Sequence, residues 1–147
     1  MFKNTVATGS KEATDAAVNI LKNGGNAIDA AVSAVFTSMT SEFALTGVGG
    51  GGAMMVKIRG EEPTIYDFFV DTPTPNLQVN KEFEKIQINF GESKQYFHIG
   101  KASIAIPGTL KGLCHIHKLH GKLPFPVVLE SGIHIAKYGC SLNAEQA

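Results

Sequence analysis

The sequence predicts an α+β fold, because helix-like segments flank a block of strand-like segments along the chain. Apolar residues recur at helical spacing before residue 40 and again after residue 108. Between these blocks, partial alternation over residues 53–59 and a β-branched, aromatic run over 64–70 predict an antiparallel hairpin. Hydrophobic residues make up 44% of the 147 residues and charged residues 18%, which is typical of a globular chain with one core. We expect one unit over residues 1–147, without an internal domain boundary.

The first forty residues predict a short strand followed by two helices. Thr5 to Thr8 has the composition of a short strand, and Ser10 is a suitable N-cap for the next helix. The glycine pair at 24–25 ends that helix, since glycine adopts the left-handed cap conformation without steric cost. Asn26 caps a second helix that runs to about residue 39 and is apolar on most sides, so we expect it to be buried. Its few polar residues form one narrow stripe: Asp29, Ser33, Thr37 and Thr40.

The rest of the chain predicts two further strands and two further helices. Apolar residues alternate over 86–90 and again over 102–106, which predicts a strand in each place. Proline and glycine at 107–108 open a helix that runs to about residue 120. A last helix spans about 126–138 and ends at Gly139.

Charge and composition exclude several classes of protein. Thirteen basic and thirteen acidic residues cancel, which gives no support for binding to nucleic acid or to an anionic membrane surface. The start of the chain does not resemble a signal peptide, and no apolar run approaches the ~20 residues that span a bilayer. We therefore expect a cytoplasmic protein without membrane contact. Cys114 and Cys140 are too few for a disulfide scaffold and are expected to be reduced thiols.

A cluster of metal-ligating residue types occurs in the helix predicted to end near residue 120. Its members are Cys114, His115, His117 and His120. Only pairs of them share a helix face, whereas a zinc site needs three or four converging ligands. Histidines near a helix C-terminus also suit the helix dipole. We expect no metal and no cofactor, and a metal-binding domain stays a minor alternative.

Four segments, in order, resemble motifs of the gamma-glutamyltranspeptidase family. Residues 22–31 (KNGGNAIDAA) resemble its "GGNA(V/I)DAA", 46–52 (TGVGGGG) its "SG(L/I)GGGG", 103–113 (SIAIPGTLKGL) its "VAVPGxxxGL", and 121–125 (GKLPF) its "GxLPW". The resemblance runs from about Thr5 to the end of the chain, and four motifs in register are far more specific than any one.

The resemblance implies the αββα sandwich of an N-terminal-nucleophile hydrolase, of which this chain is an incomplete N-terminal portion of the large subunit. Members cut themselves autocatalytically, and the new N-terminal threonine attacks a γ-glutamyl amide such as glutathione to give an acyl-enzyme. Water or an amino acid then takes the acyl group, so the family includes hydrolases and acyltransferases. That threonine belongs to the small subunit, which is the expected partner, together with a small-molecule amide substrate. No catalytic residue is assigned to this chain.

The same resemblance implies candidate substrate-binding residues. The glycine run contains G-x-G-x-x-G, but a helix precedes it and a strand follows, which excludes the strand–loop–helix order of a dinucleotide site. Its glycines are instead expected to pack closely beside the reaction centre, with Gly49 and Gly50 as substrate contacts. In a "DGRETAP"-like stretch the family has an arginine that holds the α-carboxylate of the substrate, and here Phe69 stands in its place. Asp67 of that stretch is the fourth candidate.

Each of these assignments has a structural alternative. Phe69 could be an ordinary core residue of a strand, and Asp67 could cap a turn or face solvent. The absent arginine puts γ-glutamyl specificity in doubt, because a phenyl ring cannot replace a guanidinium that pairs with a carboxylate. At the level of the whole protein, the alternative to an amide hydrolase is a truncated, non-catalytic relative that acts as a binding or interaction module. In either case we expect the 26–39 helix and the 53–70 hairpin to pack against strands outside these residues, leaving apolar side chains exposed here.

Overall fold

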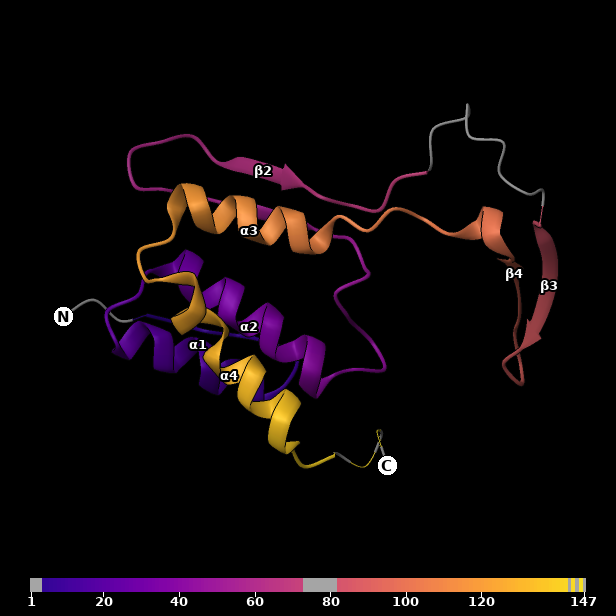
Figure 1. The fold of residues 1–147 in the computed structure, drawn as a ribbon, viewed down its shortest axis with the longest axis horizontal. Helices are drawn as coiled ribbons and strands as arrows, with labels where there is room; N and C mark the ends of the chain where they lie inside the picture. Colours follow the sequence, from indigo (N-terminus) through magenta and orange to yellow (C-terminus); the bar gives the residue numbers. More distant parts are fainter. Residues whose placement is uncertain (1–3, 73–81, 143, 145, 147) are drawn as a thin grey trace.

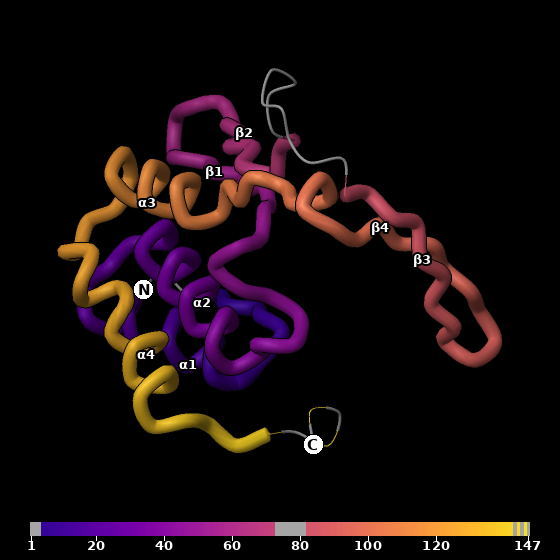
Figure 2. Tube along the Cα trace, turned by 45° about the vertical axis from the view of Figure 1, so that its right-hand side comes forward, coloured from indigo at the N-terminus to yellow at the C-terminus, as the bar shows by residue number. Residues whose placement is uncertain are grey.

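The computed structural model describes residues 4–72, 82–142, 144 and 146, and α3 forms the middle of its layered arrangement. The β1–β2 hairpin lies on one side of α3, and α1, α2 and α4 lie on the other (Figures 1 and 2). A second hairpin, β3–β4, stands apart from the helices in both views. The elements are α1 (Lys11–Lys22), α2 (Ala27–Ser41), β1 (Ala53–Val56), β2 (Thr64–Asp67), β3 (Glu84–Asn89), β4 (Lys94–Ile99), the 3-10 helix η1 (Lys101–Ser103), α3 (Thr109–His120) and α4 (Phe125–Tyr138).

The two N-terminal helices begin where their capping residues predict. The Ser10 side chain accepts a hydrogen bond from the backbone N–H of Ala13 (3.3 Å), and Gly24 follows α1 with a φ of 86°. Asn26 and Asp29 form a complete capping box at the start of α2. The predicted strand at Thr5 to Thr8 is wrong, since residues 4–8 form no strand. Val6 packs instead against the α1–α2 core, and a strand needs a neighbour to satisfy its backbone groups.

Helix α2 is the centre of the core, as its apolar composition predicts. Small residues on one side meet α1, in a buried cluster of Ala13, Ala17, Ile20, Ala30 and Ala34. On another side, Val32 and Met39 pack with Leu113 of α3 and Val128 of α4. Within the described residues α2 is thus covered by α1, α3 and α4, where strands from outside these residues were expected. Of the predicted polar stripe, Asp29, Ser33 and Thr37 are each at most 1% exposed, whereas Thr40 is only partly buried; Ser41, one turn after Thr37, is 3% exposed. The hydroxyls of Thr37 and Ser41 donate to the carbonyl oxygens four residues earlier, at 2.8 and 3.1 Å, which makes their burial tolerable.

The β1–β2 hairpin is confirmed, although it is shorter than predicted. Its strands pair antiparallel with Met55 opposite Ile65. Val56 faces the core and is buried, whereas Met55 and Ile65 on the other face are 67% and 64% exposed. The expected exposure of an apolar hairpin face is therefore confirmed for the part of the chain that the structure describes.

The β3–β4 hairpin confirms one predicted strand and corrects another. β3 covers the alternation near residue 86, and it pairs with β4, which the sequence did not indicate. The sequence of β4 lacks a clear alternation of apolar and polar residues. One of its faces combines Gln95 with Phe97 and Ile99, and the other carries a polar or aromatic side chain at each position. The strand predicted over 102–106 is wrong. η1 occupies its start, and only Ile106 pairs, through a single bridge to Asp71.

Helices α3 and α4 agree closely with the predicted bounds. α3 ends at His120 with Gly121 as its C-cap, and α4 ends at Tyr138, followed by Gly139 with a φ of 80°. Gly132 lets α4 approach α2, because a Cβ there would lie 3.0 Å from the carbonyl oxygen of Phe36. This close approach makes α4 part of the same core as α2.

The Asp29 carboxylate joins the start of α2 to the segment that follows α3. It is fully buried and accepts hydrogen bonds from the backbone N–H groups of Asn26 (2.9 Å), Lys122 (2.9 Å) and Leu123 (3.2 Å). Nε2 of His117 also lies 3.2 Å from Asp29 Oδ1, although the ring is not oriented for a hydrogen bond. A negative charge at a helix N-terminus is further stabilised by the helix dipole. Two of the segments that carry the family resemblance are therefore held together by one side chain.

Replacing Asp29 should destabilise the chain much more than the same change at an exposed aspartate. Asp29→Asn turns an NH2 group toward backbone donors, and we expect the free energy of unfolding to fall by roughly 3 kcal/mol. Asp15→Asn is the matched control, because Asp15 is exposed and pairs only with Lys11 on the helix surface. Its effect should stay within about 0.5 kcal/mol. Urea unfolding followed by circular dichroism measures both, and equal stability of the two variants would contradict the role given to Asp29.

Candidate substrate-binding site

Three segments that are far apart in the sequence meet at the start of α3. The Gly50 carbonyl oxygen accepts hydrogen bonds from the backbone N–H groups of Gly108 and Thr109, each at 3.2 Å. Gly52 and Phe68 exchange two backbone hydrogen bonds, which extend the β1–β2 pairing (3.3 and 2.9 Å). The glycine run, the end of β2 and the Pro-Gly opening of α3 thus share one place in the fold.

Crowded glycines surround Phe68 at this meeting point. A Cβ at Gly112 would lie 2.3 Å from Phe68 Cγ, and a Cβ at Gly108 would lie 2.1 Å from the Phe68 carbonyl oxygen. A Cβ at Gly51 would lie 2.4 Å from the backbone nitrogen of Val70. Distances this short exclude any larger residue without movement of the backbone or of the ring. Glycine is therefore required where β2 contacts the glycine run and α3.

Gly49 and Gly50, the two glycines expected to contact substrate, are not the crowded ones. A Cβ at Gly49 would meet open space, and one at Gly50 would make only ordinary contacts, at 3.5 Å or more. Gly49 thus has open space beside it, whereas the backbone of Gly50 is hydrogen-bonded within the chain: its N–H donates to the Gly47 carbonyl oxygen (3.3 Å), and its own carbonyl oxygen accepts from Gly108 and Thr109. Thr109 lies beside Gly50 and is 6% exposed, and no local sequence pattern singles it out.

Asp67 and Phe69 lie on the outward face of β2 and its extension. The backbone N–H of Phe69 donates to Asp67 Oδ1 (3.0 Å), so the Asp67 carboxylate is bonded to the backbone two residues later. Phe69 is 69% exposed and is not a core residue of the described part of the chain. It shares the outward face with Met55 and Ile65, which gives this side of the hairpin an apolar character.

The inward face of β2 carries a contact that the sequence did not indicate. The Tyr66 hydroxyl lies 2.6 Å from Nε2 of His120, at the last residue of α3. Side chains of a strand point alternately to its two faces, so Tyr66 and Phe68 share one face and Asp67 lies on the other. This alternation alone indicates that Tyr66 faces α3.

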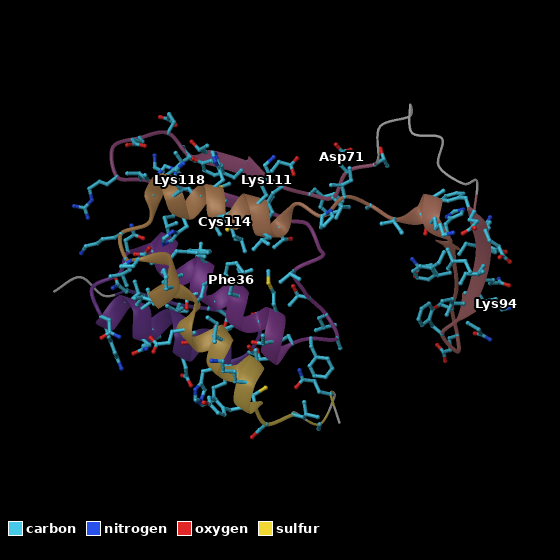
Figure 3. All side chains as sticks on the ribbon, viewed as in Figure 1. Phe36, Asp71, Lys94, Lys111, Cys114 and Lys118 are labelled. Atoms are coloured by element: carbon cyan, nitrogen blue, oxygen red, sulfur yellow. The ribbon has the colours of Figure 1, made fainter. Side chains whose placement is uncertain are left out.

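Just beyond β2, Asp71 is bridged to Ile106 by two backbone hydrogen bonds (2.7 and 3.1 Å); Asp71 is labelled in Figure 3.

The histidines near the end of α3 point to different partners. His117 lies against Asp29, whereas His120 contacts Tyr66. Within the described ranges, no three His, Cys, Asp or Glu side chains come together as a metal site would require. Cys114, labelled on α3 in Figure 3, and Cys140 are free thiols.

An apolar pocket of about 420 Å³ lies next to the glycine run. It lies between that run and the helices α2 and α4, and its lining includes Phe43, Thr46, Val48, Leu129 and Ile133. Its size falls within the range of small-molecule pockets. No helix among the described residues is both long and apolar enough to cross a lipid bilayer.

Comparison with known proteins places this arrangement in a family. The family model described as Gamma-glutamyltranspeptidase matches residues 13–147. The chain belongs to the gamma-glutamyltranspeptidase family. This assignment confirms the resemblance seen in the four motifs.

Members of the gamma-glutamyltranspeptidase family match almost the whole chain. A glutathione hydrolase proenzyme 2 of Schizosaccharomyces pombe is 33% identical over 137 residues, which is 93% of this chain and 21% of that protein. An acylase ACY 1 proenzyme of Pseudomonas sp. (strain SE83) is 29% identical, over 93% of this chain and 25% of that protein. The chain therefore spans between a fifth and a quarter of the length of these curated relatives.

A solved structure of the family confirms the fold class. The gamma-glutamyltranspeptidase of Pseudomonas nitroreducens, complexed with L-DON, superposes with a TM-score of 0.76 at 26% identity. The match covers 99% of this chain and 42% of that one. The predicted α+β class is confirmed, and the helices and small antiparallel sheets correspond to the N-terminal part of the N-terminal-nucleophile hydrolase fold.

Substituting Gly112 should destabilise the chain even though alanine favours helices. The added Cβ of Gly112→Ala would overlap Phe68, and overpacking of this kind costs about 1–3 kcal/mol, more than the gain of ~1 kcal/mol in helix propensity. Gly49→Ala is the matched control, since its Cβ meets open space, and we expect almost no change. Thermal unfolding compares the two. If Gly112→Ala melts with the wild type, the packing of Phe68 does not need this glycine.

Proposed function

We propose that this chain forms part of the substrate-recognition region of a gamma-glutamyltranspeptidase-type amide hydrolase or acyltransferase. The observation that supports it is the convergence of the glycine run, the end of β2 and the start of α3 at one place. Two of these segments are family motifs, and β2 leads into the stretch where the resemblance puts the substrate contacts. The open space beside Gly49 fits a role in binding rather than in packing, whereas both backbone groups of Gly50 are hydrogen-bonded within the chain.

In this proposal the chemistry comes from a threonine on polypeptide outside these residues. That threonine becomes N-terminal when the precursor cuts itself, and its α-amine serves as the base that activates the hydroxyl. It attacks the amide carbonyl to form an acyl-enzyme, and backbone amides stabilise the tetrahedral intermediate. Water or an amine then takes the acyl group. This chain contributes binding surface, and none of its threonines is proposed as the nucleophile.

The outward face of β2 supports an acyl donor other than a γ-glutamyl group. Phe69 stands where the family arginine pairs with the α-carboxylate, and it is exposed beside other apolar side chains. Loss of one partner of such a pair costs about 2–5 kcal/mol in binding. An apolar surface fits an acyl group that lacks this carboxylate. The relative from Pseudomonas sp. (strain SE83) is named an acylase rather than a glutathione hydrolase. We propose amides of less polar acyl groups as the substrate class.

The mass of the complete gene product tests the proposal directly. We expect intact-protein mass spectrometry to show two subunits, the smaller one beginning with threonine. Replacing that threonine with alanine should leave a single uncut chain. An uncut and inactive wild-type protein would instead favour the non-catalytic interaction module.

Restoring a cation at position 69 should shift the preference among acyl donors. In the complete enzyme, Phe69→Arg should raise kcat/KM for γ-glutamyl 4-nitroanilide relative to 4-aminobutyryl 4-nitroanilide, which lacks only the α-carboxylate. A gain of at least about tenfold follows from a charge-assisted, bidentate pair. Phe69→Leu is the control that keeps the position apolar and should leave the ratio unchanged. An unchanged ratio in Phe69→Arg would show that residue 69 does not face the α-carboxylate.

A further inference from the structure

β2 and its extension, which carry Asp67 and Phe69, are attached to α3 through two side chains. Successive side chains of a strand point to opposite faces, so Tyr66 and Phe68 face α3 while Asp67 and Phe69 face outward. Phe68 packs on Gly112, near the first turns of α3, and Tyr66 reaches His120 at the last residue of the helix. Figures 1 and 2 show β2 lying alongside α3.

The Tyr66–His120 contact has the geometry of a strong hydrogen bond. The hydroxyl oxygen and Nε2 are 2.6 Å apart, and the pair is partly buried. The two rings meet edge to face with their centroids 5.7 Å apart, and His115 packs on the same tyrosine ring at 6.1 Å. His115 therefore shares the ring contact, but only His120 has the hydrogen bond to the hydroxyl among the contacts described here.

His120 is itself held at a fixed point of the core. Nδ2 of Asn26 donates to the His120 carbonyl oxygen (2.6 Å), and the next residues bond to the buried Asp29 carboxylate through the Lys122 N–H. The imidazole thus starts from a backbone segment that hydrogen bonds hold to the start of α2. Its hydrogen bond transmits that constraint to the hydroxyl of Tyr66 and so to β2.

We propose that His120 is a positioning residue for the candidate substrate-binding site, acting through the Tyr66 hydroxyl. Together with the Phe68 contact two positions later, it holds the C-terminal part of β2 on α3, and thereby sets where the neighbouring Asp67 and Phe69 lie. This proposal rests on the proposed function for one point only, which is that Asp67 and Phe69 bind substrate. The attachment itself can be tested in this chain without any catalytic activity.

Amide hydrogen exchange measured by NMR on the 147-residue chain tests the attachment. The reporter is the Phe68 N–H, which donates to Gly52. Tyr66→Phe removes only the hydroxyl, and His120→Leu removes the ring nitrogen. Each should speed exchange at Phe68 roughly tenfold, as expected for the loss of one partly buried hydrogen bond. Amides in the middle of α1 and α2 should keep their wild-type rates, which a general loss of stability would not allow.

Three further variants make the test specific. His120→Gln can still accept a hydrogen bond from the tyrosine hydroxyl, so it should recover most of the protection at Phe68. The double variant Tyr66→Phe/His120→Leu should behave like either single variant, since both remove the same bond. His115→Gln, which removes a ring contact without a hydrogen bond, should change the Phe68 rate by less than about twofold.

The results separate the positioning role from the proposed function. Additive effects in the double variant, no recovery with His120→Gln, or an equal effect of His115→Gln would overturn the role of His120. So would a uniform rise in exchange across α1 and α2. If the exchange data agree but the complete gene product neither cuts itself nor turns over an amide, the attachment stands and the proposed function fails.

Discussion

The buried carboxylate of Asp29 is the constraint on which the arrangement of helices depends. A charge without solvent is tolerable only when hydrogen bonds replace its hydration, and here three backbone N–H groups and the dipole of α2 do so. The donors come from both the start of α2 and the turn after α3, so the bonds can form only when these segments meet. The same turn leads into α4, which packs on α2 at Gly132. One side chain therefore fixes the relative positions of three helices.

From this fixed core, steric constraints position the hairpin and the glycine run. Phe68 fits against α3 only because residues 108 and 112 have no side chain, and Gly51 approaches the backbone at Val70 for the same reason. The Gly50 carbonyl then caps the start of α3 through two N–H groups. The glycines of this region thus divide into those that permit close packing, such as Gly51, Gly108 and Gly112, and Gly49, which has open space beside it.

The surfaces that remain uncovered are consistent with the part of the family fold that this chain represents. The outward face of β1–β2 exposes Met55, Ile65 and Phe69, and the β3–β4 hairpin contacts no helix extensively within the described residues. Two-stranded sheets with an open apolar face are marginal in water by themselves. The chain spans 21–25% of the length of the relatives compared above.

The sequence by itself determined the helix ends and the first hairpin, because capping residues, glycines and strand alternation act over a few neighbouring positions. It also determined the family, through four motifs that occur in order. Local signals failed where a strand depends on its partner: Thr5 to Thr8 has none in the described structure, and β4 is defined by pairing with β3 rather than by its own pattern. The tertiary structure alone decided that Asp29 bonds to residues 122 and 123, that Tyr66 meets His120, and that Gly51 is crowded while Gly49 is open. These contacts join residues up to 94 positions apart, and no local pattern encodes a distance between segments that only packing brings together.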